Sequence, residues 1–326
     1  MKKFIRFLFI TPVLLTAVAC GSKTEKEEPN TEPTPQTEPE ETKVEPGSLG
    51  KIDVVLISGQ SNAVGCSHYI YLADTKGEDK FIEYSDGYKD ILISYDCWTK
   101  DGFDTGNYTY YSQNSSRNKF VPVKLGQGNG SSTFGPEVGI AEAMHEKYGN
   151  KLFLIKHACG ASNLKDDYTE KNSPMYPHFI KYVKDQIKLL VDQGYIPTIK
   201  AFCWMQGEGD SYNSDYYGVY QDNLRKFVSN VRGDLREYSG NKDIPFIDAG
   251  ISNAPDWPKY QQVNAAKAAF AAESENNFYI DTIAAGMHTN KEPYGHVDTA
   301  HYDSDSEVLL GHLFAQAFEQ FLISEK

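Results

Sequence analysis

The sequence predicts an α/β protein, a three-layer α/β/α sandwich around a parallel sheet. Through residues 51–326, short apolar strands alternate with segments in which apolar residues recur at helical spacing. This alternation implies parallel strands joined by right-handed crossovers, with helices on both faces of the sheet. Residues 51–326 contain no proline-rich or charge-rich linker and no internal repeat, so we expect one domain there.

The strand expected at 52–57 leads into a candidate nucleophile. Residues 54–57 form an apolar run typical of a strand buried on both faces. Ser61 lies just past the end of this strand, and open parallel sheets form their ligand crevice at the carboxyl ends of the strands. The alternative is that Gln60, Ser61 and Asn62 only satisfy backbone groups in a strand-to-helix turn.

Residues 66–132 form a long, tyrosine-rich segment with no clear helical period. Loops of this length in compact domains are usually functional or contain small elements of their own. Tyrosine rings could receive the C–H faces of sugars while their hydroxyls find polar partners. They could equally well just pack the segment, so we expect a tyrosine-rich insertion over about 66–132, with or without a role in binding.

The remaining elements continue the alternation. Further strands are predicted at 152–156, 198–205, 244–247 and 278–280. Helices are predicted from 133–137 to about 149, and then at 179–191, 216–231, 261–272 and 308–321. Two of the strands run into polar residues and glycines, at 157–160 and 206–210, so three strand ends with chemically useful residues should meet at one edge of the sheet.

Asp298 and His301 supply the base that Ser61 would need. A neutral serine hydroxyl is a weak nucleophile without an adjacent base. The three-residue spacing lets the Asp298 carboxylate accept the Nδ1 proton of His301, which leaves Nε2 facing Ser61. The competing histidines are His157, His288, His296 and His312. His301 is preferred because it alone has an acid at this spacing ahead of the last helix, whereas His157 is expected to pack in the core.

An acyl-transfer site also needs donors aimed at the developing oxyanion. The backbone N–H groups of Ser61 and Gly160 and the side-chain amide of Gln206 would lie at three adjacent strand ends and could converge. Each of these residues could instead be an ordinary turn residue. Ser61, Gly160, Gln206 and the Asp298–His301 motif follow one another in this order at the ends of strands. Together they favour the catalytic interpretation.

Five successive motifs carry a family resemblance. They are 59–62 (GQSN), 134–137 (FGPE), 156–160 (KHACG), 204–210 (WMQGEGD) and 298–301 (DTAH). Together they resemble the sialate O-acetylesterase-like (SASA) domain of the SGNH hydrolases, over about residues 52–323. The resemblance implies a flavodoxin-like SGNH hydrolase fold, no metal or other cofactor, and hydrolysis through an acyl-serine.

The resemblance also implies residue roles. Ser61 would be the nucleophile, His301 the base and Asp298 its orienting acid, with Ser61, Gly160 and Gln206 forming the oxyanion hole. Glu208 is a second carboxylate near the site, and it could orient His301 in place of Asp298.

Three positions depart from the family pattern. The family usually has Met where this chain has Ala63, Gly-Gly where it has Gly160-Ala161, and Ser where it has Gly209. The first change would alter the shape of the pocket. The second would affect the backbone geometry at Gly160.

The first 20 residues resemble a bacterial lipoprotein signal. A basic head precedes an apolar run at 7–18 that is too short to span a membrane, and small residues precede Cys20. Cys20 would become the lipid-bearing mature N-terminus; the alternative is an ordinary secretory peptide. Residues 21–50 are rich in Pro and Glu and should form a disordered, charged tether. We expect an extracytoplasmic protein, lipid-anchored to the bacterial membrane in the periplasm or at the cell surface.

Charge and cysteine content exclude several classes of partner and site. A formal net charge of −13 argues against nucleic acid or anionic lipid as partners and allows neutral ligands such as sugars. Because C-x-x-C pairs are absent from the sequence, a structural zinc site is not expected. Cys159 and Cys203 should lie in strands on either side of the first strand, too far apart to bridge. Cys66 with Cys97 is the one disulfide that we consider.

The sequence thus predicts a serine esterase that removes O-acetyl groups from a carbohydrate, such as acetylated xylan, another glycan or sialic acid. One alternative is a non-catalytic glycan-binding surface lipoprotein, and another is an esterase for non-sugar esters. The complete Ser, His and Asp set speaks against a pure binding protein, because a binder has no need of a base.

Overall fold

Strand β1 (Gly50–Gly59) lies inside the main sheet, paired in parallel with β7 (Leu152–Gly160) on one side and with β8 (Tyr195–Met205) on the other. Residues 54–57 of β1 are buried. This is the arrangement expected for a strand with helices on both faces of its sheet. It also confirms that Cys159 and Cys203 lie in the strands that flank the first one.

The sheet has the strand order β10-β9-β8-β1-β7-β3-β4, with β5 paired to β3. The other strands of this sheet are β3 (Tyr88–Lys100), β4 (Tyr108–Tyr110), β5 (Val121–Val123), β9 (Phe246–Ala249) and β10 (Asn277–Ile280). β10, β9, β8, β1, β7 and β3 are parallel, and the short strands β4 and β5 are antiparallel to β3. A small second sheet pairs β2 (Ser67–His68) with β6 (Thr133–Phe134).

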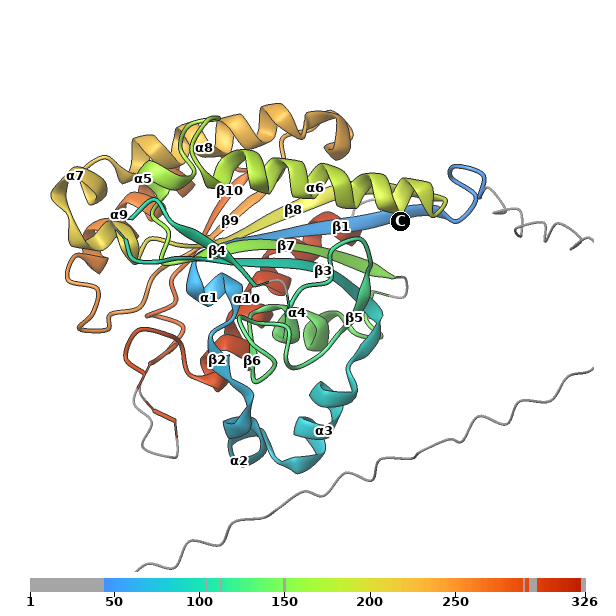
Figure 1. Ribbon diagram of the computed structural model, residues 1–326, viewed down its shortest axis with the longest axis horizontal. Coiled ribbons are helices and arrows are strands. Elements are labelled where there is room, and N and C mark those ends of the chain that lie inside the picture. Colours follow the sequence, from blue (N-terminus) through green and yellow to red (C-terminus); the bar gives the residue numbers. More distant parts are fainter. Residues whose placement is uncertain are drawn as a thin grey trace, which may run out of the picture. The chain divides into compact units, whose positions relative to one another are not determined.

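Helices cover both faces of the sheet, which confirms the three-layer α/β/α prediction. Figure 1 shows α6 and α8 on one face, with α4 and α10 on the other. The α-helices are α1 (Ser61–Val64), α2 (Leu72–Lys76), α3 (Glu78–Asp86), α4 (Glu137–Met144), α5 (Leu164–Asp167), α6 (Met175–Asp192), α7 (Ser214–Tyr217), α8 (Tyr220–Asp234), α9 (Tyr260–Ala271) and α10 (Ser304–Ile323). Short 3-10 helices are η1 (Tyr69–Tyr71), η2 (Gly209–Tyr212) and η3 (Arg236–Ser239).

The computed structural model describes residues 44–326, except 104, 112, 149–150, 290, 293–297 and 324–326. The predicted signal segment, Cys20 and most of the predicted tether lie outside the described residues. Residues 44–50, expected to belong to the tether, are grouped with the domain, and Leu49 N donates to Gly194 O (2.8 Å). Among the described residues, no helix has the length and apolar character needed to cross a bilayer.

The largest departure from the sequence prediction is β3. The segment 66–132 was expected to be a tyrosine-rich insertion, yet it supplies this 13-residue strand, which pairs in parallel with β7 along most of its length. Within β3 the apolar residues Ile93, Tyr95 and Cys97 alternate with the polar residues Ser94 and Asp96, and all five are buried. That period of two was the available signal, and the tyrosines and turn residues around it obscured it.

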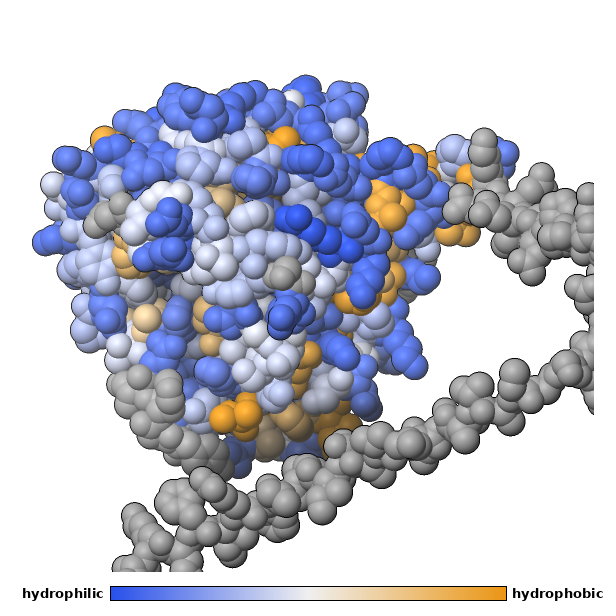
Figure 2. Space-filling model, viewed as in Figure 1, coloured by the Kyte–Doolittle hydropathy of each residue, from blue (hydrophilic) through white to orange (hydrophobic). Residues whose placement is uncertain are grey.

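The surface seen in Figure 2 is mostly hydrophilic, with small separate apolar patches. Isolated apolar residues are normal on a protein surface.

Candidate active site

Ser61 is delivered to the carboxyl edge of the sheet by a turn that only glycine can begin. Gly59 has φ +142°, and a Cβ added there would lie 1.9 Å from the carbonyl oxygen of Met205. Gln60 N then donates to that same oxygen (2.9 Å). Ser61 follows as the first residue of α1, with 8% of its surface exposed. A buried hydroxyl with limited access is thus held at the end of β1.

The side chain of Gln60 locks this turn to the loop that follows β8. Its Oε1 accepts hydrogen bonds from Gly207 N (3.3 Å), Gly209 N (3.2 Å) and Gln206 Nε2 (3.2 Å). One side chain therefore satisfies three donors from the adjacent strand end. The position of Ser61 relative to the 206–210 motif is fixed by this contact.

Asn62 connects the Ser61 turn to the His301 loop. Its Nδ2 donates to Glu208 Oε1 (2.8 Å), and its Oδ1 accepts from Tyr302 N (3.1 Å). Because Asn62 follows Ser61 and Tyr302 follows His301, this bond brings Ser61 and His301 to the same edge of the sheet. Within the described part of the chain, no hydrogen bond joins Ser61 Oγ to His301.

His301 is paired with Asp298. The distance between His301 Nδ1 and Asp298 Oδ2 is 2.8 Å, and the backbone N–H groups of Ala300 and His301 donate to Asp298 Oδ1 (2.9 and 3.1 Å). Burial raises the pKa of Asp298, but these hydrogen bonds and the histidine charge outweigh burial and lower it to about 2. Glu208, the alternative partner, instead accepts from Asn62. In this geometry Asp298 is the carboxylate at Nδ1.

Cys66 is the site residue that sequence reasoning missed. Burial lowers the pKa of His301, but Asp298 and Cys66 together outweigh burial and raise it above its ordinary value. Asn129 Nδ2 also donates to Cys66 Sγ (3.4 Å). The available signal was the position of Cys66, five residues after Ser61 in the same turn region.

The cysteines correct one expectation. Cys66, Cys97, Cys159 and Cys203 are all free thiols. The pairing considered for Cys66 and Cys97 is therefore not formed. Cys97 is buried in β3, where its Sγ contacts Val64 O at 3.9 Å, while Cys66 faces Asn129 and His301.

The strained backbone near Gly160 is at the next residue, Ala161. Gly160 is the last residue of β7 and pairs in register with Thr99, and an added Cβ would make only ordinary contact with Thr99 Oγ1 (3.4 Å). Ala161 has φ +55°, a left-handed conformation that glycine adopts more easily. This is the position at which the SASA pattern usually has its second glycine. The departure noted in the sequence thus coincides with a strained residue.

Gln206 lies at the predicted place, but its amide is engaged by the scaffold. Besides Gln60, its Nε2 contacts Asp210 Oδ2 (2.6 Å) and Ser162 O (3.4 Å), and its Oε1 accepts from Tyr220 OH (3.0 Å). Burial raises the pKa of Asp210 to about 7 despite these bonds. Among the described contacts of Gln206, none is to Ser61. Gln206 therefore connects the loops around Ser61.

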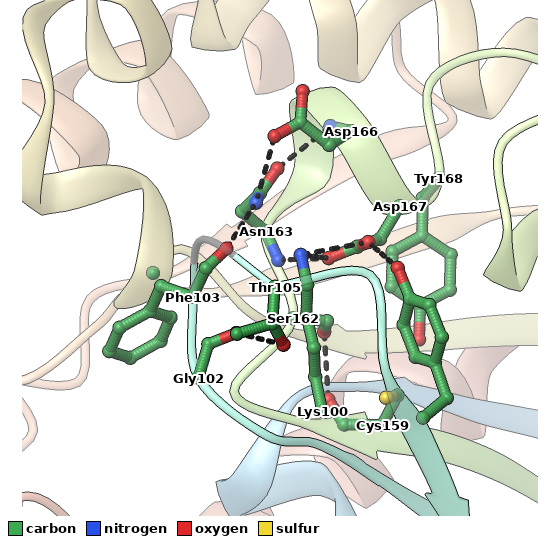
Figure 3. Close-up of polar contacts among 12 residues, drawn as sticks. Lys100, Gly102, Phe103, Thr105, Cys159, Ser162, Asn163, Asp166, Asp167 and Tyr168 are labelled. Atoms are coloured by element: carbon green, nitrogen blue, oxygen red, sulfur yellow. Dashed lines mark hydrogen bonds and ion pairs between the residues drawn. The ribbon is translucent and has the colours of Figure 1, made fainter.

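A buried charged network holds the loop that follows Gly160 (Figure 3). Lys100 Nζ lies 3.1 Å from both carboxylate oxygens of Asp167. Tyr108 OH and Asn163 N (2.7 Å) donate to the same carboxylate. Asn163 Nδ2 in turn donates to Phe103 O (3.4 Å). The β3–β4 connection and the loop after β7 are therefore fixed to each other beside the site.

A second buried ion pair, Lys156 with Glu137, contacts the last residue of α1. Lys156 and Glu137 are fully buried, and Lys156 Nζ donates to Glu137 Oε2 (2.8 Å), Val64 O (3.0 Å) and Gln127 O (2.8 Å). Glu137 Oε1 accepts from Gly135 N (2.9 Å). The FGPE and KHACG motifs thus help to hold the helix that begins at Ser61.

The other histidines have different surroundings. His157 is fully buried, and burial lowers its pKa to about 4, as expected for a core residue. Three other histidines lie against carboxylates, in pairs that the sequence did not predict: His288 Nδ1 with Asp303 Oδ2 (2.6 Å), His312 Nε2 with Glu142 Oε2 (2.8 Å) and His145 Nδ1 with Asp90 Oδ1 (2.7 Å). His296 lies outside the described residues. His301 is linked to the Ser61 turn, because the N–H of its neighbour Tyr302 donates to Asn62 Oδ1.

Potential metal ligands do not gather in the described part of the chain, where no three His, Cys, Asp or Glu side chains form a group able to hold an ion. The chemistry available at the strand ends is that of a hydroxyl, an imidazole and a carboxylate. A largely buried imidazole held by a carboxylate, at the same sheet edge as a buried serine hydroxyl, can carry a proton during acyl transfer.

Comparison with known proteins shows what the chain resembles. Residues 51–320 match the profile of a family described as "Carbohydrate esterase, sialic acid-specific acetylesterase". No curated protein sequence matches the chain.

Similar solved structures share the fold. A protein from Arabidopsis thaliana is 20% identical, with a TM-score of 0.55 over 84% of this chain and 98% of its own. NanS is 15% identical, with a TM-score of 0.55 over 85% of this chain and 98% of its own. A carbohydrate acetylesterase from Xanthomonas citri is 12% identical, with a TM-score of 0.50 over 85% of this chain and 57% of its own. At these identities the likeness supports the α/β/α fold.

Proposed function

We propose a substrate and a mechanism from one premise: the chain belongs to the carbohydrate esterase family described as sialic acid-specific acetylesterase. As a member of that family it is a carboxylic ester hydrolase. The proposed activity is removal of O-acetyl groups from a carbohydrate, in which the acetyl group passes through an acyl-serine.

In the proposed mechanism Ser61 Oγ attacks the acetyl carbonyl while His301 accepts its proton. Asp298 holds His301 in the tautomer with Nδ1 protonated and stabilises the imidazolium that forms. His301 then returns the proton to the sugar oxygen as the C–O bond breaks, leaving acetyl-Ser61. Water, deprotonated by His301, attacks this ester, and His301 returns the proton to Ser61 Oγ as the acyl C–O bond breaks and acetate is released.

The observation that carries this proposal is the 2.8 Å contact between His301 and Asp298, tied to the Ser61 turn by the bond from Tyr302 N to Asn62. A binding protein has no need of a carboxylate-held imidazole beside a serine at a strand end. For the oxyanion we propose the N–H groups of Ser61 and Gly160 as donors. Gln206 would join them only if substrate displaced one of its present partners.

We also propose that the domain works outside the cytoplasm on a lipid anchor at Cys20. The support is the amino-terminal sequence alone: a basic head, a short apolar run and small residues before a cysteine. Globomycin-sensitive processing and labelling of the wild-type chain with a fatty-acid probe, both abolished in Cys20→Ala, would support the anchor. Unchanged labelling of Cys20→Ala would contradict it.

Acetate release tests the activity. The purified domain, wild type and Ser61→Ala, would be assayed on p-nitrophenyl acetate, acetylated xylan, O-acetylated sialic acid and a simple lipid ester. We expect wild-type release from at least one carbohydrate, and a loss of about 10³-fold or more in Ser61→Ala. Wild-type hydrolysis of the lipid ester alone would reject a carbohydrate substrate. Activity that survives Ser61→Ala would reject the mechanism.

A further inference from the structure

Three aromatic rings form a cluster at the edge of the site. The ring centroids of Phe103 and Tyr212 lie 5.3 Å apart, and Trp257 lies 6.4 Å from Phe103 and 5.8 Å from Tyr212. Trp257 is buried, whereas Tyr212 leaves 50% of its surface exposed. A half-exposed ring held by two others presents a rigid apolar face to solvent.

This cluster adjoins the residues that hold the nucleophile. Gly209 N donates to Gln60 Oε1 (3.2 Å), and Gln60 directly precedes Ser61. A Cβ added to Gly209 would lie 2.9 Å from Phe103 Cδ1 and 2.6 Å from Ser162 O. The Phe103 ring thus packs against the backbone that anchors the Ser61 turn. Figure 3 shows that ring turned away from the Lys100–Asp167 network, with its backbone carbonyl held by Asn163.

The cluster opens onto a pocket of about 540 Å³, a size typical of small-ligand sites. Its lining comprises Phe103, Tyr212, Asn213, Ser214, Tyr216 and Tyr217, together with Gly209, whose N–H donates to Gln60 Oε1. Among the described residues, none of those lining it carries a charge. Aromatic faces with hydroxyl and amide groups match the two surfaces of a sugar, its C–H face and its hydroxyls.

The charges around the pocket are mainly negative. Asp166 accepts from Tyr216 OH (2.9 Å), and Asp256 adds to burial in raising the pKa of Tyr212. Lys165 lies 5.1 Å from the centroid of the Tyr216 ring and donates to the backbone oxygen of Asp215. The net charge of the chain is −13. A sugar that carries a carboxylate would meet no built cationic partner in the lining.

From this we infer that the pocket beside Phe103 and Tyr212 is a subsite for an uncharged sugar ring next to the acetylated one, so that the enzyme selects neutral glycans over sialic acid. The inference rests on the proposed function for its catalytic consequence, although sugar binding itself does not depend on it. Tyr212 would pack against the C–H face of the ring. Asn213 and Ser214 would bind its hydroxyls.

The kinetic test compares a substrate that reaches the subsite with one that does not. Values of kcat/KM would be measured on acetylated xylo-oligosaccharides and on p-nitrophenyl acetate. We expect Tyr212→Ala to reduce the ratio of the first value to the second by about five- to tenfold, and Tyr212→Phe to restore it. Ile196→Ala is the matched control, since it removes a similarly exposed apolar side chain (47%) at the opposite end of β8 from the site.

The binding test separates this inference from the proposed function. Calorimetry would measure binding of unacetylated xylohexaose and of N-acetylneuraminic acid to the wild type and to Tyr212→Ala. Weaker binding of xylohexaose to Tyr212→Ala than to the wild type would support the subsite. If the wild type also released no acetate from any glycan, that second result would reject the proposed function but not the subsite. If the wild type released acetate from a glycan, and Tyr212→Ala changed neither the ratio of kcat/KM values nor the binding of xylohexaose, the subsite would be overturned and the proposed function would stand. Tighter binding of N-acetylneuraminic acid than of xylohexaose would overturn the preference for neutral sugars.

Discussion

The turn that carries Ser61 and the loop that carries His301 are held in different ways. In the turn, Gln60, Asn62 and Ala63 are buried, and their partners come from the central strands and the 206–210 loop. In the loop, the side chains of His301 and Asp298 keep 25% and 37% exposure, and they hold each other locally. Ser61 is therefore positioned by the core, and His301 by the neighbouring Asp298 and the bond from Tyr302 to Asn62.

This difference suggests which changes should cost stability and which should cost only rate. Alterations at the buried Lys156–Glu137 pair disturb buried charge and should mainly reduce the stability of the domain. Alterations between the turn and the loop should reduce stability less and displace His301 from Ser61. The following predictions sharpen that comparison, from the largest expected effect to the smallest.

Breaking the buried pair beneath α1 should have the largest effect. Lys156→Met leaves the Glu137 carboxylate buried without its cation, and we expect a loss of about 3–5 kcal/mol in the free energy of unfolding. Urea denaturation would measure it. The double variant Lys156→Met with Glu137→Leu removes both charges and should recover part of the loss. A single variant within 1 kcal/mol of wild type would show that the pair does not support the turn.

Cutting the bond between turn and loop should mainly affect rate. Asn62→Ala removes the acceptor for Tyr302 N, and a shift of the base by about 1 Å costs on the order of 10²-fold in kcat. The same variant leaves Glu208 without its donor, so a loss of about 1–3 kcal/mol in stability is also expected. Kinetics and denaturation of the same preparation would be compared. A fall in stability with kcat unchanged would contradict the positioning role.

Removing the thiol beside the base should shift the pH profile. His301 must be neutral to accept the Ser61 proton, so kcat/KM rises as pH rises through the His301 pKa. Because Asp298 and Cys66 raise that pKa, the rising limb should lie above the ordinary value of 6.5. Cys66→Ala removes one of these influences while burial continues to lower the pKa, so the limb should move to lower pH. Cys203→Ala, in β8, is the control, and a limb that does not move in Cys66→Ala would refute the contact.

The smallest effect is expected at the strained residue after Gly160. Ala161 has a left-handed backbone conformation that is less favourable for alanine than for glycine. Ala161→Gly should therefore raise the free energy of unfolding by up to about 1 kcal/mol. Thermal unfolding would detect it. Destabilisation by this substitution would mean that the loop does not hold residue 161 at positive φ.

Much of this architecture could be predicted because it depends on local patterns. The apolar run at 54–57 and the glycines after it predicted a buried central strand with a turn, and the three-residue spacing predicted the contact between Asp298 and His301. Strand β3 was missed because its period of two lies inside a tyrosine-rich segment.

The remaining details depend on partners far apart in the sequence. Hydrogen bonds to Gln60, Ser162 and Tyr220 set the orientation of the Gln206 amide, and these residues come from three other segments of the chain. Cys66 meets His301 only because the Ser61 turn and the His301 loop fold together. The aromatic pocket likewise joins Phe103 to the 209–217 segment across the site, and no spacing along the chain signals that contact.

The most direct test of the central claim is to find where the acetyl group goes. Enzyme quenched with acid during turnover of an acetylated substrate would be digested and its peptides examined by mass spectrometry, with Ser61→Ala as the control. The mechanism predicts acetylation of the peptide that contains Ser61, at the serine itself, and none in Ser61→Ala. Acetylation at Cys66 in place of Ser61 would contradict it.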